Sequence, residues 1–557
     1  MGTLGVIFTD TCVLAEKYNC RRQEVIDVID TFIRNGVYRG IDWQLVDVGG
    51  HDFDYIFKNV KNEVSWRDYC RALADNCVGM GWQTDCNTPL FIIGGDDVIP
   101  VPQVLFQMPE NRLVPLQVDM FYGYPVDFNL REEMEKMSTK GYHRGDLFAY
   151  FMSKSVFNVS RLPLETGNIP ATVQHDLGGY FQRSLDTGGT INIDSLLPTT
   201  AYSWYISMKK AVEGIPLLPL GQDNGCHLSD IYISPMLRMT DATAMAEYKQ
   251  SLSKSDMLLF FLHGGDDPEN TGFVGQGPRP NKRDDFDPPT GEYCKAFDIE
   301  LLPYVKGNVL TTAACFGARY FSREYNYSRS QSMLLSALYD NNFLLYMGAS
   351  HEAWLSMPVF SAQSDVRLTG FSMTLIKIYL NLVMRGEPAG LALMKAKWLY
   401  YDECKSEDSE LADYTILEFN QFGDPTLAVR ALSYNQVNGQ HPIENTIRAH
   451  SEMIRSPKKE YTQLYSCKEL SSLDEAYQDV RNCVDDGLAQ LAHDLTMLLQ
   501  GDNKLTRDNL FLTHILREID ADSYLFLYAQ QSRFGDKYRT YVRADSSGNV
   551  KNIMQTI

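Results

Sequence analysis

Two apolar runs, MLLFFLHGG at residues 257–265 and VLTTAACFG at residues 309–317, decide the fold expected of this chain. Each run has the length and composition of a buried strand. The first leads into His263 and the second into Cys315. In α/β sheets the active site collects beyond the carboxyl ends of the strands. We therefore predict that Cys315 is a nucleophile and that His263 is its base.

Small residues flank both side chains. Gly264 and Gly265 follow the histidine, and Ala313 and Ala314 precede the cysteine. Residues without bulk allow a substrate backbone to come close. Taken singly, the cysteine also fits a small buried hydrophobe and the histidine a structural residue. Both interpretations stay open until the two strands are known to be neighbours.

Length and composition indicate a folded protein with more than one domain. The chain has 557 residues, of which 44% are hydrophobic and 22% charged. Single cores rarely grow beyond about 250–300 residues. The formal net charge of −20 argues against a nucleic-acid partner, which would require a basic face.

The sequence gives no sign of a membrane or export segment. The chain opens with MGTLGVIFTD, which lacks the basic start of a signal peptide, and no run reaches the roughly 18 apolar residues of a membrane span. Eleven cysteines without CxxC pairs argue against a zinc site or a disulfide framework. We expect a cytoplasmic protein with no membrane partner.

Apolar patterns along the chain predict alternating strands and helices. Residues 4–9 form a strand, 22–35 a helix and 43–48 a second strand, which is the order of a parallel βαβ unit. Further on, a strand is expected at 199–206 and one long amphipathic helix at 473–499. The fold class is therefore α/β.

Several ordered motifs then carry a family resemblance. An apolar strand ending in His-Gly, followed about fifty residues later by a strand ending in Ala-Cys, resembles the caspase-like cysteine peptidases. Within that group the chain is most similar to the gingipain family. The matching landmarks are FIIGGDDVIP at 91–100, DMFYG at 119–123, SRLP at 160–163 and FGDPTL at 422–427.

The resemblance implies a caspase-like α/β/α sandwich with a mostly parallel sheet in two tandem subdomains. These would be an N-terminal α/β subdomain at 1–175 and a catalytic subdomain at 176–435. Residues 436–557 are expected to form a small appended α+β module of unknown role.

The resemblance also implies a cysteine endopeptidase that works through an acyl-enzyme. Cys315 would attack the peptide carbonyl, His263 would transfer protons, and the N–H groups of Gly264 and Cys315 would hold the oxyanion. Trp354 would cover the substrate pocket, unless it is a core tryptophan. No metal or organic cofactor is required. The expected partners are a protein or peptide substrate and, for regulation, another protein or an activating ligand.

Two departures from the family pattern leave the specificity open. The region that should supply an acid to support the histidine, residues 200–212, contains none. Asp266 and Asp267 could line a pocket for a basic substrate residue or simply form a solvated loop. Arg319, four residues after the cysteine, would instead favour an acidic substrate residue.

Two other functions stay open beside the peptidase. The first is a catalytically inactive caspase-like scaffold that binds partners. The missing acid keeps this interpretation open, whereas the presence of His263 and Cys315 argues against it. The second is a thiol hydrolase that uses the same two residues on a small amide.

Overall fold

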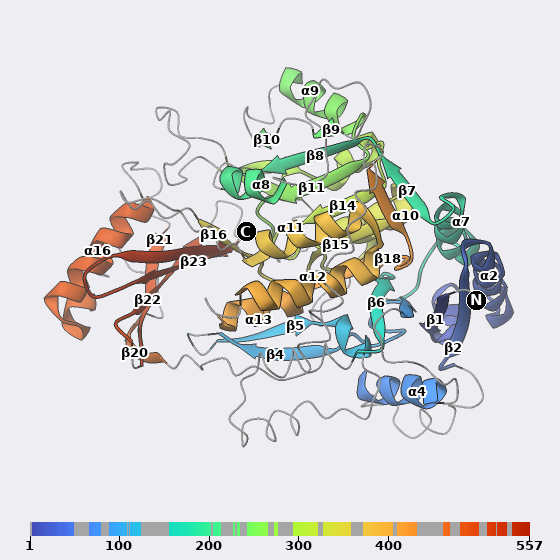
Figure 1. Cartoon of the computed structure of the whole chain (residues 1–557), viewed down its shortest axis with the longest axis horizontal. Coiled ribbons are helices and arrows are strands. Elements are labelled where there is room, and N and C mark those ends of the chain that lie inside the picture. Colours follow the sequence, from blue (N-terminus) through green and yellow to red (C-terminus); the bar gives the residue numbers. More distant parts are fainter. Residues whose placement is uncertain are drawn as a thin grey trace.

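The structure is a computed structural model of the chain (Figure 1). It describes residues 3–49, 66–78, 88–108, 110, 112–123, 155–201, 204–212, 227–228, 231–233, 242–265, 272–276, 293–320, 327–357, 371–404, 409–431, 461–467, 479–500, 510–519, 521–531 and 537–556. Asp266 and Asp267 lie outside these ranges.

A large, mostly parallel sheet forms the body of the molecule. Eleven strands of the described chain belong to it, ten of them in the order β10-β8-β11-β14-β15-β18-β6-β3-β1-β2, with β9 paired to β8. Their bounds are β1 Thr3–Thr9, β2 Ile41–Asp47, β3 Thr88–Ile93, β6 Phe157–Leu162, β8 Ser195–Thr200, β9 His227–Leu228, β10 Tyr232–Ile233, β11 Met257–Phe261, β14 Val309–Thr312, β15 Leu345–Ala349 and β18 Phe419–Gly423. The predicted α/β fold is confirmed at this level.

The sheet consists of two parallel halves that run in opposite directions. Strands β8, β11, β14 and β15 are parallel to one another, and so are β18, β6, β3 and β1. The halves meet where β15 pairs antiparallel with β18. The carboxyl ends of the two sets of strands therefore lie at opposite edges of the sheet.

Helices cover this sheet and explain its apolar strands. In Figure 1, α11 and α12 run across the front of the central strands, while α2 and α7 lie beside the N-terminal strands. Every residue of β11, β14 and β15 is buried. The helices are α1 Thr11–Lys17, α2 Arg22–Gly36, α4 Trp66–Val78, α7 Gly179–Asp186, α8 Tyr205–Val212, α9 Ala242–Leu252, α10 Met333–Asp340, α11 Phe371–Val383, α12 Ala389–Cys404, α13 Ser409–Glu418 and α16 Asp486–Gln500.

Short strands and turns of helix complete the body. The strands are β4 Gln103–Gln107, β5 Leu113–Gln117, β7 Thr190–Ile193, β12 Phe273–Gln276, β13 Tyr293–Phe297, β17 Arg385–Pro388 and β19 Ala428–Ala431. The turns are η1 Val37–Arg39, η3 Asp119–Gly123, η4 Gln174–Gly178, η6 Ile299–Tyr304 and η7 Arg329–Gln331. Within the described ranges, no helix combines the length and apolarity needed to cross a membrane.

A second, antiparallel sheet lies at the end of the molecule opposite to the N-terminal strands β1 and β2 (Figure 1). Its order is β16-β24-β23-β22-β21-β20. Five of these strands come from the C-terminal module: β20 Tyr461–Ser466, β21 Leu510–Glu518, β22 Tyr524–Gln531, β23 Lys537–Ala544 and β24 Val550–Thr556. The sixth, β16 (Trp354–Met357), comes from the main body and pairs with β24.

The two faces of this sheet are buried against different partners. Ile515, Phe526 and Val542 pack in a small core that includes residues of α16. Leu525 and Tyr541 belong instead to the large core of the body. The module is therefore packed onto the body through a continuous apolar face.

Candidate active site

The structure places His263 and Cys315 at the same edge of the large sheet. Strands β11 and β14 are parallel neighbours, and Phe260 pairs with Thr312. His263 and Cys315 each stand three residues beyond that pair. The two predicted residues thus follow adjacent strands at matching positions.

Backbone packing brings the two segments into direct contact. A Cβ atom on Gly264 would lie 1.8 Å from the carbonyl oxygen of Cys315, so no larger residue fits without movement of the chain. His263 is anchored by two backbone hydrogen bonds with Val274, of 2.8 and 2.7 Å. The glycine after the histidine is therefore required by the approach of the two backbones.

The thiol of Cys315 contacts the backbone of Ala353. The N–H of Ala353 donates to Sγ at 3.2 Å, and the thiol of Cys315 donates to the carbonyl oxygen of Ala353 at 3.7 Å. The shorter contact, from the N–H, favours the thiolate, whereas the longer contact, to the carbonyl oxygen, favours the thiol. Ala353 was not predicted from the sequence, because an alanine amide has no sequence signature.

The turn after the thiol has an uncommon backbone conformation. Phe316 has a φ of 55°, in the left-handed region that residues other than glycine rarely occupy. Its N–H donates to the carbonyl oxygen of His351 at 2.8 Å. This hydrogen bond fixes the direction in which the chain leaves Cys315.

The segment expected to supply an acid beside His263, residues 200–212, instead places the ring of Trp204 there. Trp204 follows β8, the strand that neighbours β11, and its ring centroid lies 4.2 Å from that of His263. The expected strand at 199–206 is wrong, because β8 ends at Thr200 and α8 begins at Tyr205. Trp204 was missed, although an aromatic after a strand adjacent to the histidine strand is a usable signal.

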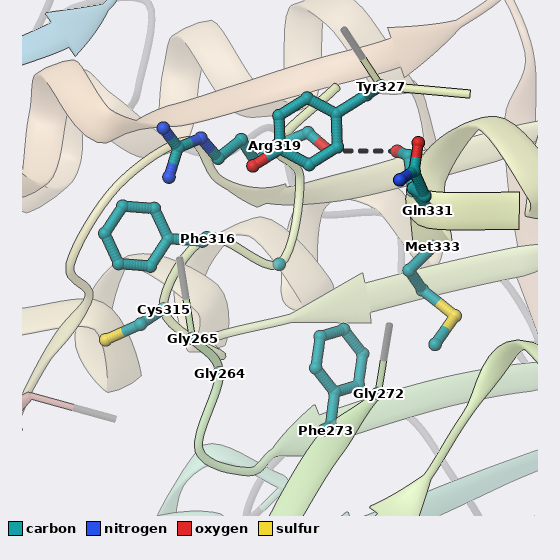
Figure 2. A pocket seen from close by; sticks show the side chains of 12 residues that line it. Gly264, Gly265, Gly272, Phe273, Cys315, Phe316, Arg319, Tyr327, Gln331 and Met333 are labelled. Carbon is teal, nitrogen blue, oxygen red and sulfur yellow. Dashed lines mark hydrogen bonds between the residues drawn. The ribbon is translucent and has the colours of Figure 1, made fainter. Parts of the chain in front are cut away.

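Both candidate catalytic residues are buried in this conformation. Cys315 is 3% exposed and His263 is 0% exposed. An open cavity lies beside Cys315, and its empty space, counted together with the adjoining solvent, is about 380 Å³. In Figure 2 the sulfur points away from Phe273 and Met333, which line the opposite part of that cavity.

Arg319 is the charged residue among the described lining of this cavity. Its guanidinium carbon lies 5.1 Å from the ring centroid of Phe316 and 5.7 Å from that of Tyr327. Cation–π contacts of this kind hold an arginine against aromatic faces. The guanidinium is therefore held near the Cys315 turn, where it can attract an acidic group.

Trp354 lies in the interface with the C-terminal sheet. Its side chain is 0% exposed, and its ring centroid is 4.5 Å from that of Tyr541. Its backbone N–H donates to Ser372 Oγ at 3.2 Å. In this conformation the indole is packed as a core residue would be.

His351 is the second histidine near the thiol. Its Nδ1 accepts a 2.8 Å hydrogen bond from the N–H of Glu352 and lies 3.0 Å from the hydroxyl of Tyr414. Burial lowers the pKa of His351 to about 4. The imidazole is therefore neutral at pH 7, with its Nδ1 lone pair engaged.

A buried ionic cluster joins the thiol's surroundings to the module. Arg112 donates two hydrogen bonds to Glu352, of 3.3 and 2.7 Å, and Arg539 donates one of 3.3 Å. Tyr541 donates to Glu110 at 2.7 Å. These residues were missed in the sequence, where charges distant from one another along the chain carry no pairing signal.

Comparison with known proteins adds no assignment to this geometry. No protein-family model matches the chain, and no curated protein matches it either.

Proposed function

We propose that the chain is a cysteine endopeptidase of the gingipain-like, caspase-like kind. The observation that carries the proposal is the register of β11 and β14, with His263 and Cys315 at equivalent positions beyond adjacent parallel strands. The contact of Gly264 with the Cys315 backbone adds to it. Two unrelated residues would not be expected to follow adjacent strands at the same distance beyond a paired position.

The proposed reaction forms and breaks one covalent bond to the enzyme. The Cys315 thiolate attacks the scissile carbonyl carbon, and N–H groups of Gly264 and Cys315 hold the oxyanion. The C–N bond then breaks as His263 gives a proton to the leaving amine. Water, deprotonated by His263, releases the acid product and restores the thiol.

The architecture agrees with a two-part catalytic body. We assign residues 1–175 and 176–435 to two tandem subdomains of a caspase-like sandwich, as the family resemblance implies. The sheet direction reverses between β15 and β18, and β18 of the second segment pairs parallel with β6 of the first. Residues 436–557 form the appended module. Six cysteines of the described ranges are free thiols: Cys12, Cys20, Cys70, Cys315, Cys467 and Cys483. Free thiols are typical of a reducing compartment such as the cytoplasm.

A substrate library and thiol labelling test the proposal together. Wild type, Cys315→Ala and the control Cys483→Ala are incubated with fluorogenic peptides varied at the residue before the cleaved bond. Cys483 is exposed and distant in sequence from the site, so its replacement should leave cleavage intact. Cleavage that survives Cys315→Ala contradicts the assigned nucleophile.

A catalytically inactive scaffold is the second candidate function, and the burial of both His263 and Cys315 favours it. Alkylation by iodoacetamide, mapped by peptide mass, separates the two. An enzyme requires Cys315 to react faster than the buried Cys70, whose pKa burial raises. Equal, slow labelling together with no cleavage of any peptide supports the scaffold.

A further inference from the structure

The backbone that touches the sulfur continues directly into the C-terminal sheet. Ala353, whose N–H lies 3.2 Å from Sγ, is followed by Trp354, the first residue of β16. β16 pairs with β24, with Trp354 opposite Thr556 and Met357 opposite Ile553. Any displacement of the module's sheet along this pairing therefore moves the residue next to Ala353.

An ionic clamp fixes the residue on the other side of Ala353. Glu352 is 9% exposed and accepts hydrogen bonds from Arg112, which precedes β5, and from Arg539 in β23. Burial by itself would raise the pKa of Glu352, but Arg112 and Arg539 hold it below its usual value. The side chain is thus a carboxylate held between one arginine of the body and one of the module.

A second set of contacts holds Arg112, the body's partner of Glu352, in place. Glu110 lies 3.0 Å from Nε of Arg112 and accepts a 2.7 Å hydrogen bond from the hydroxyl of Tyr541. Tyr541 also packs against the indole of Trp354. The residues before and after Ala353 are therefore both held by side chains of β23.

We propose that Arg539 is a positioning residue for Cys315, which holds the Ala353 amide against the sulfur by fixing the carboxylate of Glu352. The inference rests on the proposed peptidase function, because it concerns the same thiol. In this proposal the C-terminal module, through Arg539, is a structural part of the active site. Arg539 does not touch the reacting atoms and acts only through Glu352.

The physical effect is on the charge state of the thiol. A hydrogen bond from Ala353 stabilises the thiolate, and hydrogen bonds weaken steeply as donor and acceptor lose alignment. Loosening Glu352 allows the amide to turn away from Sγ. We expect Arg539→Met to lower the thiolate fraction of Cys315 roughly threefold at a pH below the midpoint, which corresponds to about half a pKa unit.

The test titrates the thiol and needs no peptidase activity. The far-ultraviolet thiolate absorbance of each variant is measured against pH, and that of the same variant carrying Cys315→Ala is subtracted. The matched control is Arg517→Met, which removes an exposed arginine from β21 of the same sheet. Arg539→Met and the control carry the same change of net charge.

A double-mutant cycle with Glu352→Gln separates positioning from a direct field effect. If Arg539 acts through Glu352, Arg539→Met shifts the thiol titration in the wild-type background and has little effect in the Glu352→Gln background. A shift of equal size in both backgrounds overturns the proposal, and so does a shift no larger than that of Arg517→Met.

Amide hydrogen exchange gives a second readout if Glu352→Gln does not fold. The segment 351–357 should exchange faster in Arg539→Met than in Arg517→Met, because the Ala353 amide loses its fixed partner. Unchanged exchange in this segment overturns the proposal. Neither measurement depends on cleavage, so failure of the peptidase function and failure of the positioning role give different results.

Discussion

The two histidines near the thiol have different surroundings and therefore different chemistry. His263 is anchored by backbone bonds to Val274 and contacts Trp204. His351 has its Nδ1 engaged by Glu352 and Tyr414, and burial lowers its pKa to about 4. A general base is most effective when its pKa lies near the working pH. A histidine with a pKa of about 4 is therefore a weak base at neutral pH.

Replacing each histidine by glutamine tests this difference. We expect His263→Gln to lower kcat/KM by about 10²–10⁴-fold, the usual contribution of a positioned acid–base group. His351→Gln should cost less than about tenfold, because the amide oxygen can accept the Glu352 N–H in place of Nδ1. The measurement is kcat/KM on the best fluorogenic peptide. Equal losses in the two variants contradict the assignment of His263 as the base.

Glu418 is a buried acid that the proposed reaction does not use. It is 0% exposed, and neither carboxylate oxygen has a hydrogen-bond partner within the described residues. Burial raises its pKa well above 4.5, Glu352 raises it further, and Lys397 lowers it. Because the folded protein keeps a proton that the unfolded chain releases, the free energy of unfolding falls as pH rises from 4.5 towards the folded pKa.

Glu418→Gln should therefore stabilise the protein, and more so as pH rises. We expect little difference at pH 4 and a gain of about 1–3 kcal/mol at pH 7, because the amide does not titrate and so avoids the pH-dependent loss caused by the raised pKa of Glu418. Urea unfolding at both pH values measures it. The exposed Glu247 of α9 gives the control Glu247→Gln, expected to stay within about 0.5 kcal/mol at either pH. A destabilised Glu418→Gln at pH 7 would show that the carboxylate is needed.

At the scale of elements, two glycines mark the ends of the β11–β14 pair. A Cβ on Gly307 would lie 1.8 Å from the carbonyl oxygen of Asp256, at the start of the strands, and one on Gly264 would lie 1.8 Å from that of Cys315, at their end. The strands are therefore pressed together at both ends by positions that accept no side chain.

Alanine at each glycine separates strand packing from the site. We expect Gly264→Ala and Gly307→Ala each to lower the free energy of unfolding by about 1–3 kcal/mol or more, since the backbone must move to admit a methyl group. Only Gly264→Ala should also change the alkylation rate of Cys315. Urea unfolding and mass-mapped alkylation give the two quantities. Unchanged alkylation in Gly264→Ala would place the contact outside the site.

Some elements could be predicted from the sequence and others could not, for identifiable reasons. The strands 257–262 and 309–314 were predicted almost to the residue, because a strand buried on both faces is continuously apolar. β8 was missed because Pro198 interrupts its sequence, and proline is rare in central strands. Even so, Pro198 pairs with Leu259 of β11.

The helix expected at 473–499 is wrong in its extent. Residues 479–483 form one helical turn, and α16 begins separately at Asp486. Asp485 accepts a 2.9 Å hydrogen bond from the N–H of Leu488, as a capping side chain does. The Asp485 in the sequence was a usable signal for this helix start.

At the scale of the molecule, three of the motifs on which the predicted resemblance rests meet at one buried arginine. Arg161 is 0% exposed and donates to both carboxylate oxygens of Asp119, at 2.8 and 2.7 Å. Its remaining nitrogen donates to the carbonyl oxygens of Gly94 and Ile99. Three motifs that are distant in the sequence are thus held by one guanidinium, and their role in the body is structural.

Breaking this pair should destabilise the whole molecule. We expect Asp119→Asn to lower the free energy of unfolding by about 3–5 kcal/mol, because it leaves a buried guanidinium without a counter-charge. Urea unfolding measures the change, and Asp42→Asn, at an exposed position of β2, is the control. A loss as small as that of the control would show that the carbonyl contacts alone neutralise Arg161.

The remaining large-scale features were beyond the sequence. Neither the reversal between β15 and β18 nor the insertion of β16 into the C-terminal sheet leaves a local pattern. Both depend on pairing between segments far apart in the chain. The cluster of Glu352 with Arg112 and Arg539 was unpredictable for the same reason.

The position of β18 determines when, during synthesis of the chain, the large sheet can be completed. β18, residues 419–423, lies between β6, residues 157–162, and β15, so it joins segments that leave the ribosome far apart in time. Until residue 423 emerges, the nascent chain presents β6 as an open strand edge, which is a template for wrong pairing. Translation, and not local folding, therefore sets the earliest moment at which the sheet carrying the thiol is complete.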